Sequence, residues 1–419
     1  MRLLILCNNV PGVIRSALSG RPESDVNWLD SVLTGLRRQS AVSLEMLCLG
    51  QAAASGSLDE GFSYLVFPCK RTHRQAPELE RLFGQRLDAF RPDVIHIWGT
   101  EFPHTLAMLR ACGDRGLLDK TAVSIQGLCH VCAERYTDGL PPGAVYSFTF
   151  RDLVRMDNIR LQRRKFALRG EIEIRALRLA RHVIGRTPWD YACTEKINPE
   201  RVYHFCNETL RDVFYTGHWR YESCRKHRIF ASSCVYPVKG FHYLLEAMAM
   251  VAEKYPDVTL AVPGKSFLNL TGKNRLREDG YHRYLARLAR KLGLGDKLEF
   301  LGSCSADEMK AAFLEANVFV LPSTIENSPN SMGEAMLLGV PCVAADVGGV
   351  SALLKDGEEG SIYPAGQPRQ LADSICRVFA MEVGAERMGA AARVHALQTH
   401  DPEKNLKDLL EIYRELQEN

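Results

Sequence analysis

The sequence of 419 residues predicts an α/β protein with two doubly wound domains. Short apolar segments bounded by turn residues alternate with segments of helical periodicity, which is typical of parallel sheets covered by helices. The alternation breaks in the polar, aromatic-containing segment 208–227 and then starts again. We therefore expect one domain over residues 1–212 and a second over 213–400.

The first series begins with an apolar segment, RLLILC at 2–7, that predicts a buried strand. Residues 28–36 (WLDSVLTGL) follow, and their apolar side chains recur at the spacing of one helical face. Further strands of this series are predicted at 93–99, 121–127, 182–187 and 201–205.

The second series repeats the alternation in the C-terminal half. Its strands are predicted at 229–233, 259–264, 297–302 and 318–323, and its helices at 241–255, 281–293 and 306–316. Doubly wound sheets bind ligands at the carboxyl ends of their strands. We therefore expect the functional site in a cleft between the two domains.

Composition argues against several classes of protein. The net charge of +3 is too small to indicate a nucleic-acid partner. The apolar runs are shorter than the roughly 20 residues that span a bilayer, and the N-terminal MRLLILCNN lacks the long apolar core of a secretory signal. The 13 cysteines follow no repeating frame, which indicates reduced thiols and a cytoplasmic protein.

Residues 323–349 (STIENSPNSMGEAMLLGVPCVAADVGG) contain the strongest local candidate site. They follow a predicted strand, and a helix is expected to begin near Ser331 and to end at Gly339. The N-terminus of such a helix offers unpaired N–H groups and a positive dipole, and therefore suits a phosphate. Glu326 on the loop and Glu334 inside the helix would flank that anion.

Each of these two carboxylates also has a plain interpretation. Ser331 and Glu334 match a capping box, in which Glu334 would only satisfy the end of its own helix. Glu326 would then be a solvated loop residue. In the functional interpretation the carboxylates accept hydrogen bonds from hydroxyls, and a nucleotide sugar has hydroxyls on both sides of its diphosphate.

Four motifs of the C-terminal half resemble those of glycosyltransferase family 4. Glu326 and Glu334 form a Glu-x7-Glu motif followed by AMLLGVPCVAADVGG. Residues 236–248 (YPVKGFHYLLEAM) resemble the Lys-Gly motif of that family. Residues 261–264 (AVPG) and 299–309 (EFLGSCSADEM) match in kind and in order.

The resemblance implies the GT-B fold, with two Rossmann-like domains that face each other across a cleft. Residues 1–212 would form the acceptor side, 213–400 would bind the nucleotide sugar, and a C-terminal helix in 401–419 would cross back to the first domain. Within the family, the chain most resembles bacterial enzymes that assemble exopolysaccharide or other surface glycans.

The resemblance also assigns roles to single residues. Glu326 would contact hydroxyls of the donor sugar, and Lys239 would neutralise the leaving diphosphate. His130 would line the reaction centre, although a structural role is the alternative for a single loop histidine. Glu334 would bind the ribose. The other donor-binding residues implied by the resemblance are Asn327, Ser328, Asn330, Ser331, Gly264, Gly302 and Gly12.

The sequence departs from the family pattern at two places that bear on the site. The family usually has an arginine five or six residues before the lysine, where this chain has Cys234 and Ser233. One cation of the phosphate site is therefore missing or supplied from elsewhere. The family often carries a histidine near the position of Gln126, whereas here His130 lies four residues further on.

Metal and redox sites have weaker support. Cys129 and Cys132 form a C-x-x-C motif, but a zinc site would need a second pair at matching spacing, and a redox site would need a thioredoxin-like context. The chain contains no Asp-x-Asp motif, which metal-dependent glycosyltransferases usually carry. We therefore expect a nucleoside diphosphate sugar as co-substrate, with no required metal and no other cofactor.

Residues 151–186 are strongly basic, with eleven Arg or Lys against four Asp or Glu. Solvated surface helices are the plain interpretation. Alternatively, the segment forms a basic amphipathic surface that contacts an anionic membrane at the inner face of the plasma membrane. Its arginines would also suit a lipid-linked diphosphate acceptor.

The sequence therefore predicts a retaining glycosyltransferase that moves a sugar from a nucleoside diphosphate, such as a UDP-sugar, to an acceptor hydroxyl. The expected acceptor is a lipid-linked or growing surface glycan. Two alternatives remain: a nucleotide-sugar 2-epimerase of the same fold, and a non-catalytic nucleotide-sugar-binding protein.

Overall fold

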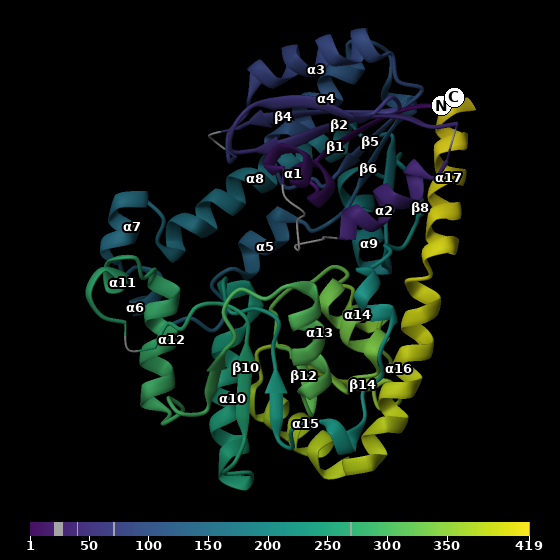
Figure 1. Cartoon of the computed structure of the whole chain (residues 1–419). Coiled ribbons are helices and arrows are strands. Elements are labelled where there is room, and N and C mark those ends of the chain that lie inside the picture. The colour runs from purple at the N-terminus through teal and green to yellow at the C-terminus, as the bar shows by residue number, and fades with distance from the viewer. Residues whose placement is uncertain (21–27, 40, 70–71, 269, 419) are drawn as a thin grey trace. The chain divides into compact units, whose positions relative to one another are not determined.

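The chain folds into two compact units, shown in Figure 1. The computed structural model describes residues 1–20, 28–39, 41–69, 72–268 and 270–418. The first unit contains Met1–Val131, Lys165–Arg211 and His400–Asn419, and the second contains Cys132–Arg164 and Asp212–Thr399.

The segment Cys132–Arg164 belongs to the second unit, whereas the sequence predicted it within the first domain. Hydrogen bonds explain the difference. Nε2 of His242 donates to the carbonyl oxygen of Asp138 at 3.0 Å, and Arg283 donates to the carbonyl oxygen of Phe148 at 2.9 Å. Such contacts join residues far apart in the sequence, so the alternation of strands and helices did not reveal them.

The first unit contains an eight-stranded sheet with the order β3-β4-β2-β1-β5-β6-β7-β8. Neighbouring strands are parallel except for the antiparallel pair β3 and β4. All strands expected in this half are present, and β2, β3 and β4 are additional. The strands are β1 (Arg2–Cys7), β2 (Ser43–Gly50), β3 (Ala54–Asp59), β4 (Phe62–Pro68), β5 (Val94–Trp98), β6 (Thr121–Ser124), β7 (His182–Gly185) and β8 (Val202–Phe205).

Helices cover both faces of this sheet, and each face has its own apolar cluster. Leu4 belongs to one cluster with Phe83, whereas its neighbour Leu3 belongs to the other with Leu33, as expected for a strand buried on both faces. The helices are α1 (Gly12–Ser19), α2 (Trp28–Arg37), α3 (Pro77–Phe90), α4 (Pro103–Gly113), α9 (Pro188–Ile197) and α17 (Pro402–Glu418), together with the first unit's parts of α5 (Cys129–Arg135) and α8 (Ile159–Leu179), which both extend into Cys132–Arg164.

Helix α17 confirms the expectation that the C-terminal helix returns to the first domain. Tyr413 on this helix is fully buried, and its hydroxyl lies 2.7 Å from Nδ1 of His96 on β5. The other ring nitrogen of His96 lies 2.6 Å from the hydroxyl of Ser124 on β6. Burial lowers the pKa of His96 to about 3, so the ring remains neutral in the core.

The second unit contains a six-stranded parallel sheet with the order β11-β10-β9-β12-β13-β14. Trp219, in the segment expected to join the domains, is buried in this unit and donates from Nε1 to the carbonyl oxygen of Ala316 at 2.7 Å. The strands are β9 (Arg228–Phe230), β10 (Thr259–Val262), β11 (Leu298–Phe300), β12 (Val318–Leu321), β13 (Cys342–Asp346) and β14 (Gly360–Pro364).

Helices of the second unit follow the strands as the sequence predicted, and two short ones, α6 and α7, come from Cys132–Arg164. The helices are α6 (Pro142–Val145), α7 (Phe150–Arg155), α10 (Phe241–Lys254), α11 (Gly272–Leu276), α12 (Gly280–Lys291), α13 (Ala306–Glu315), α14 (Asn330–Leu338), α15 (Pro368–Met381) and α16 (Ala385–Thr399). Among the described residues, none of the helices combines the length and the apolar composition that crossing a bilayer requires.

Replacing Tyr413 with phenylalanine tests how firmly α17 is bound to the first unit. Tyr413→Phe leaves Nδ1 of the buried His96 without its partner, which should lower the free energy of unfolding by about 1–3 kcal/mol. Tyr191→Phe is the control, because Tyr191 is 41% exposed and its hydroxyl donates to the exposed side chain of Glu195 at 2.9 Å. Urea denaturation should show a loss of no more than about 0.5 kcal/mol for the control; equal losses would contradict this account of α17.

Candidate active site

The strand order of the second unit reverses between β9 and β12, which lie side by side. Chains that leave neighbouring parallel strands at such a switch point diverge and form a crevice, where doubly wound sheets bind ligands. Lys239 lies on the connection after β9, and Glu326 lies on the connection after β12. Topology therefore brings together two residues that are 87 positions apart.

Lys239 and Glu326 form an ion pair, with Nζ and Oε1 separated by 2.6 Å. The hydroxyl of Ser323 donates to the same Oε1 at 2.8 Å. Among the described residues no hydrogen bond reaches Oε2 of Glu326, so this oxygen can accept one from a ligand hydroxyl. The side chains are 35% and 12% exposed, so the pair faces solvent only in part.

The charge of Lys239 is secure at neutral pH. Burial alone would lower the pKa of Lys239, but the charge of Glu326 and its hydrogen bond outweigh that effect and hold the pKa above its ordinary value. Lys239 is therefore a fixed cation, and Glu326 is the group that holds it.

Glycine at position 240 makes the approach of the two connections possible. Gly240 ends the short 3-10 turn Pro237–Lys239 in a left-handed conformation with φ of 63°. A Cβ there would lie 1.8 Å from the carbonyl oxygen of Pro322, which is too close for any residue other than glycine. Beside this contact, the amide of Thr324 donates to the carbonyl oxygen of Val238 at 2.8 Å.

A second glycine holds the backbone of Glu326 from the other side. Gly348 has φ of 55°, and a Cβ there would lie 1.8 Å from the carbonyl oxygen of Glu326. That oxygen accepts a hydrogen bond from the amide of Gly349 at 3.1 Å. Gly348 and Gly349, at the end of the segment 323–349, thus help to position Glu326.

Helix α14 begins one residue earlier than predicted, and this rules out the capping box of Ser331 and Glu334. Its N-cap is Pro329, with no side-chain cap, so Ser331 lies inside the first turn and does not cap the helix with Glu334. Glu334 is 4% exposed, on the buried part of the helix. Asn330 opens the first turn, whose N–H groups suit an anion. Ahead of it on the loop lie the buried residues Asn327 and Ser328.

Gly264 and Gly302 lie side by side at the ends of β10 and β11. Their backbones bond to each other twice, with N···O distances of 2.7 and 3.1 Å. Both have positive φ, and a Cβ at either would meet no atom within 4 Å, so open space adjoins both glycines. Next to Gly264 is a cavity of about 440 Å³, and Cys234, Lys265, Arg277, Asp279 and His282 are among its lining residues.

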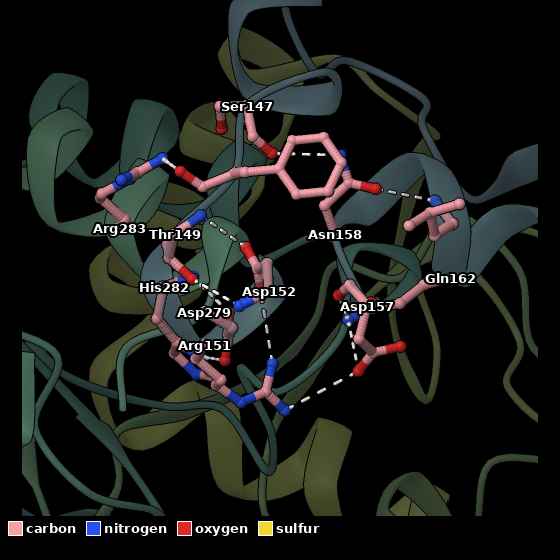
Figure 2. Close-up of polar contacts among 12 residues, drawn as sticks. Ser147, Thr149, Arg151, Asp152, Asp157, Asn158, Gln162, Asp279, His282 and Arg283 are labelled. Atoms are coloured by element: carbon pink, nitrogen blue, oxygen red, sulfur yellow. Dashed lines mark hydrogen bonds and ion pairs between the residues drawn. The ribbon is translucent and has the colours of Figure 1, made fainter. Parts of the chain in front are cut away.

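The cavity contains a histidine that the sequence analysis missed. Nδ1 of His282 lies 2.6 Å from Oδ2 of Asp279, the N-cap of α12, as Figure 2 shows. Burial lowers the pKa of His282, but hydrogen bonds to Asp279 and Cys234 outweigh burial and raise the pKa to about 10. A charged imidazole therefore lies beside Cys234, which is one of the two positions, with Ser233, where the family usually has arginine. The D-x-x-H spacing at 279–282 was the available signal.

His130, in contrast, belongs to the first unit. Nδ1 of His130 lies 2.8 Å from Oε2 of Glu173, a carboxylate with no exposed area. Glu173 also accepts hydrogen bonds from the amides of Cys129 and His130, at 3.1 and 3.2 Å, and from the hydroxyl of Thr100 at 2.7 Å. The ring of His130 is thus oriented by a buried acid and remains 23% exposed.

A second carboxyl group of the first unit was not predicted. Glu101 follows β5 and accepts a hydrogen bond from the side-chain amide of Asn8, which in turn bonds to His104 at 2.7 Å. Burial, helped by the charge of Glu173, raises the pKa of Glu101 to about 7. Gly12, the first residue of α1, is buried in the connection that follows Asn8. The signal for Glu101 was its place directly after a buried strand.

Two further expectations can be compared with the structure. Cys129 and Cys132 are free thiols, and the described part of the chain contains no group of three or more metal-ligating side chains. The basic segment 151–186 is not one continuous surface, because β7 is buried in the sheet and Arg186 is ion-paired with Glu208 at 2.6 Å inside the first unit.

The C-terminal half of the chain resembles a known protein family and several curated proteins. Residues 225–395 match the family described as glycosyl transferases group 1. A D-inositol 3-phosphate glycosyltransferase of Corynebacterium urealyticum is 29% identical over 179 residues, which are 43% of this chain and 41% of that protein. A phosphatidyl-myo-inositol mannosyltransferase of Mycobacterium leprae is 29% identical over 178 residues, 42% of this chain and 43% of that protein. The chain spans about two fifths of the length of the curated relatives it matches.

Solved structures match over nearly the whole chain. Sucrose-phosphate synthase from Thermosynechococcus elongatus has a TM-score of 0.73 at 16% identity, covering 99% of both chains. Anabaena Alr3699/HepE in complex with UDP-glucose has a TM-score of 0.66 at 16% identity, covering 98% of this chain and 99% of that one. These likenesses confirm the predicted GT-B fold.

The role of Gly240 can be separated from the cost of its backbone conformation. Gly293 has a similar φ of 68°, but a Cβ there would meet nothing within 4 Å. Gly293→Ala should therefore cost only the left-handed strain, about 1–2 kcal/mol. Gly240→Ala should cost clearly more in urea denaturation, because the connection after β12 must also move. Equal losses for the two variants would show that the contact with Pro322 does not constrain the site.

Proposed function

We propose that this chain, whose residues 225–395 belong to the group 1 glycosyltransferases, transfers a sugar from a nucleoside diphosphate to an acceptor hydroxyl with retention at the anomeric carbon. The ion pair of Lys239 and Glu326 at the strand-order switch point carries this proposal. It places a fixed cation beside a carboxylate that can accept hydrogen bonds from hydroxyls. A sugar linked to a diphosphate needs both, because the cation binds the diphosphate and the carboxylate binds the sugar.

The donor is held by the second unit. Its diphosphate binds at the first turn of α14, near Asn330 and Ser331, where N–H groups and the helix dipole attract an anion. Glu334 accepts a hydrogen bond from the ribose, and the base lies near Gly302, where open space adjoins the backbone. Anabaena HepE, which shares the fold, was solved with UDP-glucose, so we propose a UDP-sugar as donor.

Transfer relies on stabilising the leaving group. Negative charge develops on the diphosphate as the glycosidic bond breaks, and a preorganised cation is worth more at that stage than in the ground state. Lys239 supplies this charge, and Oε2 of Glu326 accepts a hydrogen bond from a sugar hydroxyl while Oε1 keeps Lys239 in place. The departing phosphate takes the proton of the acceptor, so the second unit needs no separate base.

His282 replaces the arginine that the family usually supplies. It lines the same cavity as Cys234 and Gly264, and its raised pKa keeps it charged at neutral pH. The carboxylate of Asp279 orients the ring. We assign to His282 the second positive charge of the diphosphate site.

The acceptor is bound by the first unit, where His130 and Glu101 are the polar candidates for contacting its hydroxyl. Two relatives are named for inositol-containing acceptors, and one of these is a phospholipid. We therefore propose a lipid-linked or growing surface glycan as acceptor, and a cytoplasmic protein that works at the inner face of the plasma membrane.

A panel of UDP-, GDP-, ADP- and dTDP-sugars with a lipid-linked acceptor extract tests the function and its independence of metal. We expect one donor to raise the melting temperature, because a ligand stabilises the fold by RT ln(1 + [L]/Kd). That donor should release its nucleoside diphosphate only when acceptor is present, at the same rate in EDTA. Release of epimerised sugar without acceptor would indicate the epimerase, and binding without turnover would indicate the non-catalytic protein. Activity lost in EDTA and restored by Mg²⁺ would refute metal independence.

Removing the charge of Lys239 should affect chemistry more than binding. A charge-assisted hydrogen bond contributes about 1.5–3 kcal/mol, and a tenfold change in rate corresponds to about 1.4 kcal/mol. Lys239→Ala should therefore lower kcat by about ten- to a hundredfold, with a smaller loss of donor affinity. Lys239→Arg should restore activity only in part, since a planar fork does not replace a point charge.

The matched control is Lys355→Ala, because Lys355 also pairs with a glutamate, Glu358, but is 63% exposed on the surface. Its kcat should be unchanged. If Lys239→Ala keeps kcat within about threefold of wild type, equivalent to less than 1 kcal/mol, the leaving group is stabilised elsewhere and the assignment is wrong.

A further inference from the structure

Six large apolar side chains of the second unit are exposed within eleven consecutive residues, 146–156. We call them the apolar patch. Single exposed apolar residues are ordinary, but contiguous ones mark interaction surfaces. The patch consists of Tyr146 (60% exposed), Phe148 (41%), Phe150 (61%), Leu153 (58%), Val154 (69%) and Met156 (61%).

Polar side chains of the same segment hold its backbone through hydrogen bonds, which Figure 2 shows. Thr149 and Asp152 form a capping box at the start of α7, with N···O distances of 3.0 and 3.1 Å. The side-chain amide of Asn158 donates to the carbonyl oxygen of Ser147 at 3.1 Å. Asp152 and Asn158 are almost completely buried.

The same segment is bound to α12. Arg283 donates to the carbonyl oxygen of Phe148 at 2.9 Å. Oδ2 of Asp152 lies 3.0 Å from the position that a Cβ would take at Gly280, so α12 and α7 are in close contact. These hydrogen bonds fix the backbone of the segment. The segment cannot rotate to bury its apolar side chains without breaking them.

Met156 adds an independent observation. It has a left-handed conformation with φ of 49°, which glycine adopts at less cost, and yet it carries an exposed apolar side chain. This residue ends α7, because its amide donates to the carbonyl oxygen of Asp152, and its side chain is left on the surface.

The surroundings of the patch are basic. Residues 141–164 and α12 together contain nine Arg or Lys and two Asp, although the whole chain has a net charge of only +3. Both of these aspartates lie beside Arg151, at 3.3 and 3.8 Å. Within the described chain, Arg155, Arg160 and Arg164 are exposed and have no carboxylate partner.

We infer that the apolar patch and the arginines beside it dock the protein on an anionic lipid surface. A membrane offers both an apolar layer for the side chains and negative headgroups for the arginines. A second copy of the chain fits less well, because a symmetric dimer through this surface would bring like-charged arginines together. The docking surface is thus 146–164 with α12, rather than 151–186 as a whole.

Co-sedimentation of the full chain with vesicles tests the inference without any measurement of sugar transfer. The protein should bind vesicles of phosphatidylcholine and phosphatidylglycerol at low salt, and only weakly bind phosphatidylcholine alone. Binding should fall as salt shortens the Debye length to about 3 Å at 1 M. Absence from the pellet with anionic vesicles at low salt would overturn the proposal.

Two pairs of substitutions distinguish lipid binding by the apolar patch from non-specific adsorption of exposed apolar side chains. Phe150→Gln with Val154→Gln removes two side chains of the patch, and should weaken binding to anionic vesicles about tenfold or more. Val383→Gln with Val394→Gln is the matched control, since these valines are 58% and 59% exposed elsewhere on the unit. The control pair should bind like wild type, and an equal loss in both pairs would refute the assignment.

Arg155→Gln with Arg160→Gln should weaken binding about tenfold or more and flatten its salt dependence.

A tryptophan at position 150 would report insertion directly. The chain already has four tryptophans, so each variant is compared with wild type: anionic vesicles should shift the emission of Phe150→Trp further to the blue than that of wild type, whereas Val394→Trp should shift no further than wild type. An unshifted Phe150→Trp in the pellet would overturn insertion of the patch. The contrary outcome is a protein that forms dimers in solution and binds no vesicles. If the double variant Phe150→Gln with Val154→Gln dissociated those dimers, the partner of the patch would be a second copy of the chain, and the lipid proposal would be refuted.

The outcome does not depend on the proposed transferase activity. Vesicle binding without turnover would uphold the surface and count against the proposed function alone. Turnover of a water-soluble acceptor should be the same in Phe150→Gln with Val154→Gln as in wild type, because the patch lies outside the donor site.

Discussion

The carbonyl oxygen of Pro322 occupies the place where a side chain at position 240 would have to be. Only glycine permits this approach, and its positive φ then turns the chain so that Lys239 reaches the connection after β12. The backbone bond between Thr324 and Val238 holds the two connections together. The ion pair of Lys239 and Glu326, and the catalytic role proposed for it, depend on this single backbone contact.

The remaining parts of the donor site follow from the parallel sheet beneath it. Strands that end at one edge bring Lys239, Glu326 and the first turn of α14 together, although they are remote in sequence. The connections that leave β9 and β10 also border a cavity in which His282 has its charge fixed by Asp279. The role proposed for His282, as the second cation of the diphosphate site, rests on this cavity and on its pairing with Asp279.

The sequence predicted the alternation of both sheets and the ends of α14 to within one residue, and it singled out Lys239 and Glu326 without predicting the ion pair between them. It missed β2, β3 and β4, and polar residues account for the first two. Glu45, buried within β2 and paired with Arg86, and the polar residues of the edge strand β3 interrupt the apolar pattern. Burial raises the pKa of Glu101, and hydrogen bonds raise the pKa of His282 against the effect of its burial, and only the folded chain provides either environment. The assignment of 132–164 to the second unit likewise rests on tertiary hydrogen bonds.

A double-mutant cycle on donor turnover tests most directly whether Lys239 and Glu326 act as one unit. It compares kcat/KM for Lys239→Met, Glu326→Gln and the double variant with wild type. If each residue works through the other, the double variant should lose little more than the worse single variant, with a coupling energy of about 1 kcal/mol or more. Losses that add to within about 0.5 kcal/mol would mean that the two residues act independently, and would contradict the account.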